Sequence, residues 1–118
     1  MGALRRWFGG FTRSDEERLD DEVREWAETI PDTDRIKACP TREPVRISGV
    51  VRRLTLRPAN GSITLEAVVS DGTGEVTAMW TGRDHIPGLA LGTQVVLEGV
   101  LGMERARHRM VNPDFEFA

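Results

Sequence analysis

Between residues 45 and 111 apolar and polar residues alternate in short runs, and each run ends at a turn rich in glycine, asparagine or proline. An extended strand with this alternation has one apolar and one polar face, whereas a helix needs apolar residues three and four positions apart. No amphipathic helical stretch separates the runs, so parallel strands joined by helices are not expected. The pattern therefore predicts a small, mainly β domain with one apolar interior.

The runs predict five strands. The first spans residues 45–56 and contains Gly49, and its alternation changes phase after Val51, which indicates a bend or bulge. Asn60-Gly61 is a strong hairpin signal after this strand. A longer connection, residues 82–92, has room for one helical turn near Asp84. The other four strands are predicted at residues 63–70, 76–81, 94–101 and 109–111.

Five strands with a long, bent first strand suit the partly open Greek-key barrel of the OB type. A five-stranded SH3-like barrel is the structural alternative. We expect that alternative to have a shorter first strand and less chain between strands three and four. The fold predicted for residues 45–118 is therefore an OB barrel.

The N-terminal part divides into a tail (residues 1–13), a helix (14–30) and a linker (31–44). Ser14 and Glu17 form a capping box at the start of the helix, and Pro31 stops it. Three prolines mark the linker. One face of the helix carries an apolar stripe at spacings of four, three and four, made of Leu19, Val23, Trp26 and Ile30.

The apolar stripe requires a partner. It either packs on its own barrel and closes one open end, or contacts another chain in a homodimer or a protein complex. Trp7, Phe8 and Phe11 lie among arginines in the tail, a mixture that suits base stacking or an anionic membrane surface. A terminus of this kind is more often a tail or a docking segment.

Composition argues against several functional classes. No apolar run is long enough to span a membrane or to form a signal peptide, so we expect a cytoplasmic protein. Cys39 is the single cysteine, which excludes an intrachain disulfide and a metal site built on paired cysteines. His85 and His108 fall in different loops, and no nucleophile set is suitably spaced. We therefore expect neither an enzyme nor a cofactor.

Charge is unevenly distributed along the chain. Residues 1–44 contain eight basic and eleven acidic residues, whereas residues 45–118 contain eight of each. Within the predicted barrel, residues 46–61 carry four arginines and no acid, and residues 102–111 carry three arginines and one acid. These regions include the loops that border the binding groove of an OB barrel.

The candidate nucleic-acid-binding residues are the arginines of these regions, for phosphate, and two residues of strand three, for stacking on bases. Trp80 has an alternative place in the core because it shares strand parity with Val76 and Ala78. The complete candidate set is Arg46, Arg52, Arg53, Arg57, Met79, Trp80, Arg105, Arg107 and Arg109.

Five segments resemble, in order, the OB domains of RecG-type helicases (their wedge domain) and of the tRNA-anticodon-like group. The sequence departs from the helicase pattern at Thr81, where an aromatic residue is common. It also contains no Gly-x-x-x-x-Gly-Lys-Ser/Thr loop. The resemblance thus implies a small, free-standing bacterial OB protein without a motor. The resembling segments are residues 45–51, 69–80, 86–89, 92–99 and 110–116.

Together these observations predict a non-catalytic protein that binds single-stranded DNA or RNA weakly, with little sequence preference and strong salt dependence. The alternative is a protein-interaction module that uses the N-terminal helix and binds no nucleic acid.

Overall fold

The computed structural model describes residues 13–118 except Asn60. The predicted tail, apart from the backbone of Arg13, lies outside the described residues, as does the side chain of the predicted cap, Ser14. Within the described part, no helix is both long and apolar enough to cross a membrane. The elements are α2 (Arg13–Glu28), the 3-10 helix η1 (Ile36–Ala38), β1 (Pro44–Ala59), β2 (Ser62–Ser70), β3 (Glu75–Thr81), β4 (Gln94–Val100), β5 (Gly102–Glu104), β6 (Arg107–Val111) and β7 (Asp114–Phe117).

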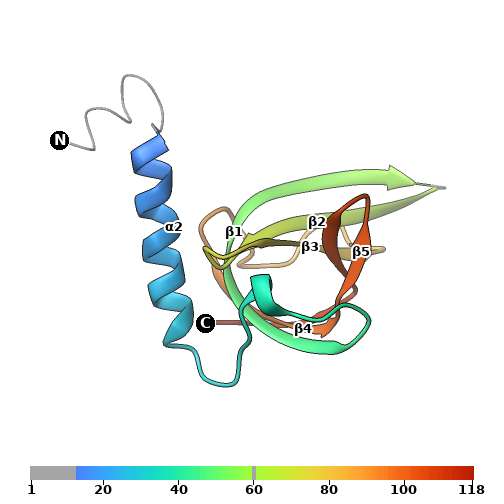
Figure 1. Ribbon diagram of the computed structural model, residues 1–118. Coiled ribbons are helices and arrows are strands. Elements are labelled where there is room, and N and C mark those ends of the chain that lie inside the picture. The colour runs from blue at the N-terminus through green and yellow to red at the C-terminus, as the bar shows by residue number, and fades with distance from the viewer. Residues whose placement is uncertain (1–12, 60) are drawn as a thin grey trace.

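Strand β1 curves around the barrel and belongs to both of its sides (Figure 1). Its first half pairs with β4 and its second half with β2, both antiparallel, and a bulge interrupts the second pairing between Val51 and Arg53. At Gly49, β1 passes so close to β2 that an added Cβ would come within 2.6 Å of Val69 Cγ1. The bulge confirms the predicted change of phase after Val51, and β1 is curved as expected (Figure 1).

The sheet has seven strands, so the prediction of five was wrong. The error lies after β4, where β5, β6 and β7 replace the single last strand predicted at residues 109–111. Arg105 and Ala106, with φ of 50° and 64°, make the turn between β5 and β6. Such turns usually carry glycine or asparagine, and neither residue marks this one in the sequence.

The barrel is an open sheet in the order β5-β6-β3-β2-β1-β4-β7, in which β3 and β6 are paired in parallel. Inward side chains follow the predicted alternation, for example Val76, Ala78 and Trp80 on β3. The helical turn expected near Asp84 is absent from that connection. The most deeply buried apolar side chains are Ile36, Ile47, Leu97, Leu101, Met110, Val51, Val69, Val76 and Val95.

The buried carboxylate of Asp71 joins the linker to the β2–β3 turn. Its Oδ1 accepts hydrogen bonds from the backbone N–H groups of Thr73 (2.8 Å) and Gly74 (3.1 Å) and from the Thr73 hydroxyl (2.6 Å). Its Oδ2 accepts the N–H of Ile36 at 2.8 Å. Because Ile36 is 1% exposed and packs in the core cluster, η1 is part of the barrel rather than a free connection.

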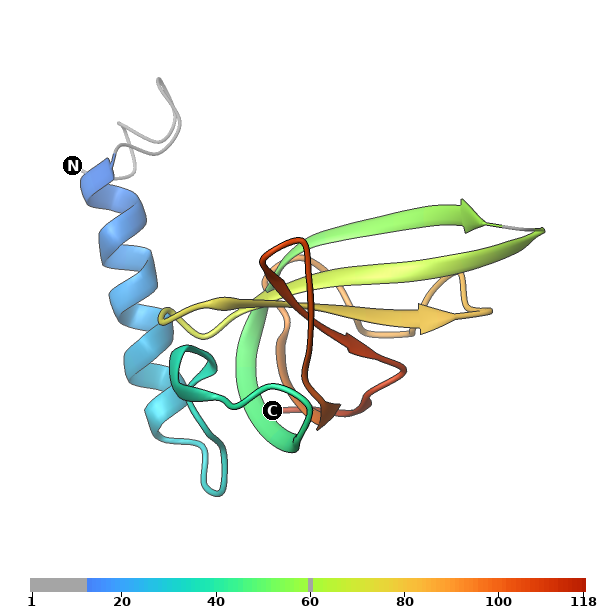
Figure 2. The ribbon, with the colours of Figure 1, turned by 45° about the vertical axis from the view of Figure 1, so that its right-hand side comes forward.

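Helix α2 stands beside β1 and meets the β2–β3 turn (Figure 2). Gly72, with φ +84°, comes so close that a Cβ there would lie 2.3 Å from the Asp20 carbonyl oxygen. Ser48 Oγ also donates to the Ala27 carbonyl at 3.3 Å. The residues of the predicted apolar stripe lie on α2 or just beyond its end. They are half-buried and do not belong to the core cluster: Leu19, Val23, Trp26 and Ile30.

We expect Asp71→Ala to lower the free energy of unfolding by about 3 kcal/mol, because four hydrogen-bond donors lose a buried charged acceptor. Asp71→Asn should cost less, because its amide oxygen still serves the turn while its NH2 group faces the N–H of Ile36. Urea unfolding followed by circular dichroism measures both. Asp34→Ala, which removes an exposed carboxylate of the same linker, is the control. Equal urea midpoints for Asp71→Ala and the control would contradict this role.

Candidate nucleic-acid interface

A hollow of about 420 Å³ lies on the outer face of β2 and β3. Val68 and Thr77, which are register partners on these strands, form its floor. One wall comes from β1 and the other from the β5–β6 hairpin, and Glu75 adds one carboxylate at the start of β3. The lining residues are Arg52, Arg53, Val68, Glu75, Thr77, Ala106, Arg107 and His108.

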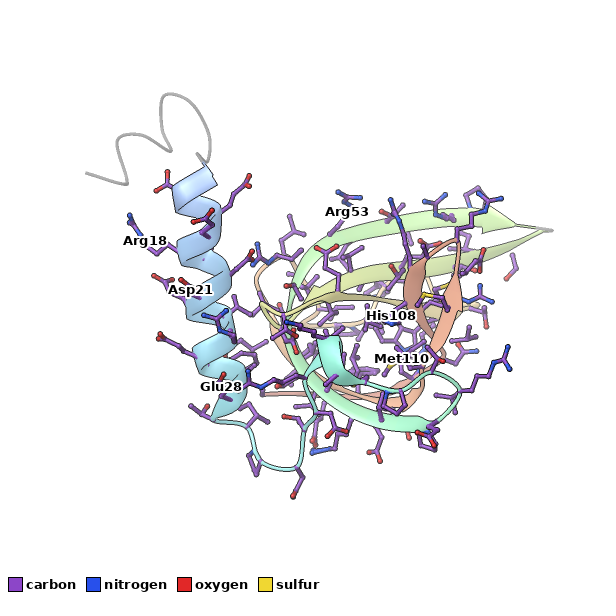
Figure 3. The ribbon with its side chains drawn as sticks, in the orientation of Figure 1. Arg18, Asp21, Glu28, Arg53, His108 and Met110 are labelled. Carbon is purple, nitrogen blue, oxygen red and sulfur yellow. The ribbon has the colours of Figure 1, made fainter. Side chains whose placement is uncertain are left out.

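The β1 bulge explains why two consecutive arginines reach the same hollow. In a regular strand, neighbouring side chains point to opposite faces. At a bulge, two residues oppose one on the partner strand, and the alternation is interrupted. The register passes from Val51 opposite Val69 to Arg53 opposite Val68, so Arg52 is the extra residue. Arg52 and Arg53 are both exposed, and Figure 3 shows Arg53 pointing away from the barrel.

Ion pairs divide the candidate arginines into two groups. Four have carboxylate partners: Arg46 with Glu116, Arg52 with Asp20, Arg57 with Glu66, and Arg109 with Glu104. The other three form no ion pair with any carboxylate in the described part of the chain: Arg53, Arg105 and Arg107. These three are exposed and lie at or beside the two walls of the hollow.

The structure brings together only part of the predicted site. Arg52, Arg53 and Arg107 line the hollow, and Arg105 is at the tip of the β5–β6 hairpin. Arg109 is the register partner of Thr77 and so belongs to the same outer surface. Met79 is half-buried, two residues along β3 from Thr77, and Arg57 lies farther out on the β1–β2 hairpin.

Arg46 and Trp80 lie elsewhere. Arg46 is on the half of β1 that pairs with β4, and it lines a separate hollow with Glu98 and Glu116. Trp80 is 4% exposed, its Nε1 donates to the Pro113 carbonyl at 3.1 Å, and its ring meets Phe115 edge to face at 5.6 Å. Of the two alternatives for Trp80, the structure therefore supports the core position and not a stacking surface.

The sequence prediction missed the floor of the hollow and His108. Val68 and Thr77 face outward because their neighbours along each strand are buried, which the alternation alone could have shown. His108 lies on β6, opposite Val76, and Figure 3 shows it near the centre of the molecule. Its place depends on the unpredicted β5–β6 hairpin.

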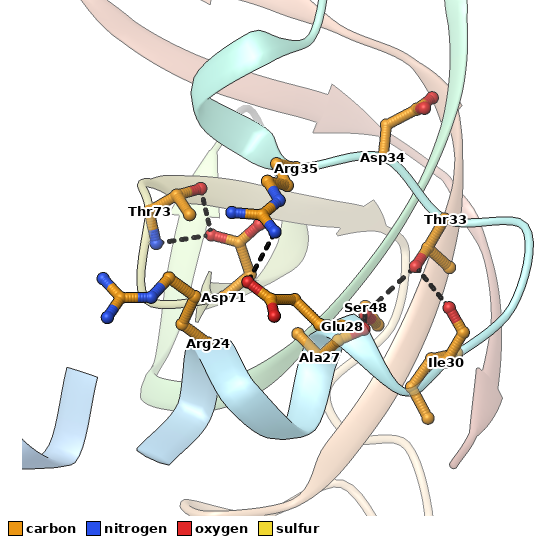
Figure 4. Close-up of a pocket in the computed structure, with 10 residues that line it drawn as sticks. All are labelled: Arg24, Ala27, Glu28, Ile30, Thr33, Asp34, Arg35, Ser48, Asp71 and Thr73. Carbon is orange, nitrogen blue, oxygen red and sulfur yellow. Dashed lines mark hydrogen bonds and ion pairs between the residues drawn. The ribbon is translucent and has the colours of Figure 1, made fainter. Parts of the chain in front are cut away.

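A second hollow, of about 190 Å³, lies between α2 and the linker (Figure 4). Its polar groups bind one another: Arg35 contacts Glu28 at 2.5 Å, and Thr33 donates to the Ile30 carbonyl at 3.0 Å. The carboxylate of Asp71 in this hollow already accepts the hydrogen bonds described above. These contacts make the region a joint between helix and barrel, with few polar groups left to hold a ligand.

Two titratable groups outside the hollow on β2 and β3 have shifted pKa values. Burial raises the pKa of the Cys39 thiol, and the nearby carboxylates of Asp34 and Asp71 raise it further. A hydrogen bond from the His85 side chain lowers the pKa of the Asp84 carboxyl, and the two groups are 3.0 Å apart on an exposed loop. Neither residue lines the hollow on β2 and β3.

Comparison with solved structures identifies the fold. A replication factor A related protein from Methanobacterium thermoautotrophicum matches with a TM-score of 0.59 and 13% identity, over 73% of this chain and 90% of that chain. A replication protein A heterotrimer bound to ssDNA matches with a TM-score of 0.52 and 19% identity, over 83% of this chain and 76% of that chain. At these identities the likeness shows an OB-type fold.

RecG bound to a three-way DNA junction matches with a TM-score of 0.63 and 15% identity. The match covers 97% of this chain, so it includes α2 as well as the barrel, but it spans only 18% of the RecG chain. No protein-family model matches the sequence, and no curated protein matches it.

Because Trp80 is a core residue, Trp80→Phe is expected to lower the free energy of unfolding by about 2 kcal/mol, through a small cavity and an unpaired Pro113 carbonyl. Met79→Ala, a truncation of a half-buried side chain on the outer face of the same strand, should cost less. Urea unfolding followed by far-ultraviolet circular dichroism compares the two without relying on tryptophan fluorescence. A larger loss for Met79→Ala would show that Trp80 is not a core anchor.

Proposed function

We propose that this protein binds single-stranded nucleic acid along the outer face of β2 and β3, without catalysing a reaction. The observation that carries the proposal is the hollow on β2 and β3, hereafter the groove, which has Arg52 and Arg53 on one wall and Arg107 on the other. Cations on both sides of a groove suit a phosphate backbone, and the floor between them suits bases. OB barrels bind oligonucleotides at this face, between the loops that border it.

The similar solved structures support the proposal in a limited way. Replication protein A was solved with ssDNA and RecG with a DNA junction, and both share the fold of this chain. Their low identities mean that their ligands do not transfer by similarity alone. The case for nucleic acid therefore depends on the charges and shape of this groove.

The same groove predicts weak binding. Of the candidate arginines, only Arg53, Arg105 and Arg107 are exposed and without an ion-pair partner in the described part of the chain, and Glu75 lies in the hollow. Neither phenylalanine nor tryptophan lines it, so bases meet Val68 and Thr77 at its floor instead. Two or three phosphate contacts on a single strand correspond to a log–log salt slope of about −1.5 to −2.

A second candidate function is protein binding through α2. The observation in its favour is that Leu19, Val23, Trp26 and Ile30 are half-buried but contribute nothing to the barrel core. Groups of Asp20, Arg24 and Ala27 on α2 meet the barrel. Replacing Val23 and Trp26 by serine should then change the mass of a complex or oligomer in size-exclusion chromatography while leaving oligonucleotide binding intact.

The proposed binding is tested by fluorescence anisotropy with labelled oligo-dT and oligo-U of about twelve nucleotides, a length that one OB barrel can contact. We expect Arg53→Ala together with Arg107→Ala to weaken binding about tenfold or more in low salt, and to flatten the salt slope by about 1.4. The reason is the loss of two phosphate contacts from opposite walls.

The matched control is Arg18→Ala together with Arg46→Ala, which removes the same charge from sites outside the groove. Arg18 points away from the barrel in Figure 3, and Arg46 lies in a separate hollow. The control should bind within about twofold of the unmodified protein. No binding by the unmodified protein at about 100 µM, or an equal loss in both double variants, would rule the proposal out.

A further inference from the structure

Helix α2 places negative charge at one end of the groove. Residues 13–28 contain eight acidic and three basic residues, a net charge of −5. One of these acids contacts the groove directly, since Asp20 Oδ1 accepts a hydrogen bond from Arg52 Nη2 at 3.0 Å. Arg52 also lines the hollow on β2 and β3. The acidic N-terminal part of the chain therefore meets the groove at this residue pair.

The helical repeat extends this contact into an acidic edge. Glu16, Asp20 and Arg24 are four residues apart and so lie in one row along α2. Arg24 and the Asp20 carbonyl adjoin Gly72 of the β2–β3 turn, which fixes this row on the barrel side. Figure 2 shows that the helix continues past this turn toward its N-terminus. Glu16, which is exposed, extends the same row by one turn.

We propose that α2 competes, within the same molecule, with the nucleic-acid backbone for Arg52. The carboxylate of Asp20 forms an ion pair with Arg52, so a phosphate of a bound nucleic acid can contact Arg52 only by displacing that carboxylate. The proposal rests on the proposed function of the groove. It assigns to Asp20 the role of a residue that limits affinity and the number of phosphates contacted. Phosphates that approach this end of the groove meet a negative helix row as well as an occupied arginine.

The ion pair is suited to displacement. Both side chains are partly in solvent, 33% exposed for Arg52 and 51% for Asp20. An exposed pair of this kind is weak and screened by salt. A polyanion with several phosphates is therefore able to compete for Arg52 once its other contacts are made.

The pair is not needed to hold α2 in place. Ser48 binds the Ala27 carbonyl, Gly72 packs against the helix backbone at Asp20 and Arg24, and Arg35 binds Glu28 at the C-terminal end of α2. Removing the Asp20 charge consequently leaves the joint between helix and barrel intact. This separation allows the competition to be tested without unfolding the protein.

The test compares Asp20→Asn with Asp21→Asn in the full chain, using the labelled oligo-dT and anisotropy assay. Both variants remove one negative charge from neighbouring positions of α2, but Asp21 pairs with Arg24 of the same helix, at 2.7 Å, and not with the groove. We expect Asp20→Asn to bind about threefold more tightly than the unmodified protein, with a salt slope steeper by about 0.7. Asp21→Asn should stay within about twofold.

A double-mutant cycle with Arg52→Ala identifies the residue that is released. In the unmodified background this change should weaken binding little, because Arg52 is occupied, whereas in Asp20→Asn it should remove the whole gain. Circular dichroism melting of each variant confirms that the fold is retained.

Equal affinities of the two asparagine variants, in a protein that binds the oligonucleotide, would overturn the competition and leave the proposed function standing. Absence of binding in the unmodified protein and in all variants would overturn both. Tighter binding by Asp20→Asn that persists when Arg52 is alanine would also overturn the proposal, because the gain would then come from general charge and not from Arg52.

Discussion

The hydrogen bonds of Asp71 hold together the three parts of this protein. One carboxylate oxygen fixes the β2–β3 turn through Thr73 and Gly74, and the other fixes η1 through the N–H of Ile36. The turn fixed in this way carries Gly72, against which α2 packs. Because a buried carboxylate is stable only when its oxygens are hydrogen-bonded, the position of linker, turn and helix is coupled to this one side chain.

The coupling has an electrostatic consequence. By docking α2 at the β2–β3 turn, it brings the acidic N-terminal part of the chain beside the outer face of the barrel, where Asp20 meets Arg52. The total charge of −3 says little about this arrangement. What a ligand meets is a groove with cations on its walls and a negative helix row at one end.

Features that follow from the alternation of buried and exposed residues within one strand were predictable from the sequence. Features that depend on contacts between segments far apart in the sequence were not. Alternation predicted β1 to β4, and its change of phase predicted the bulge after Val51, because one buried face imposes a period of two. It predicted part of β6, at residues 109–111, but neither β5 nor β7. The β5–β6 hairpin was missed because Arg105 and Ala106 turn the chain without a glycine. Nor did alternation identify Asp71, whose partner Ile36 is 35 residues away. The same limit applies to Arg46, whose ion-pair partner is 70 residues away.

The number of arginines near the groove overstates the positive charge that a bound nucleic acid would meet, because several of them are paired with carboxylates. Among the candidate arginines, the three without an ion-pair partner in the described part of the chain lie beside the β1 bulge (Arg53) or at and beside the β5–β6 turn (Arg105 and Arg107). Within the regular ladder an arginine has neighbours on the adjacent strand, as Arg109 has Glu104 on β5. Exposed pairs of this kind are weak, so a polyanion competes for the paired arginines as well. The affinity of such a groove is therefore set by its own carboxylates as much as by its cations.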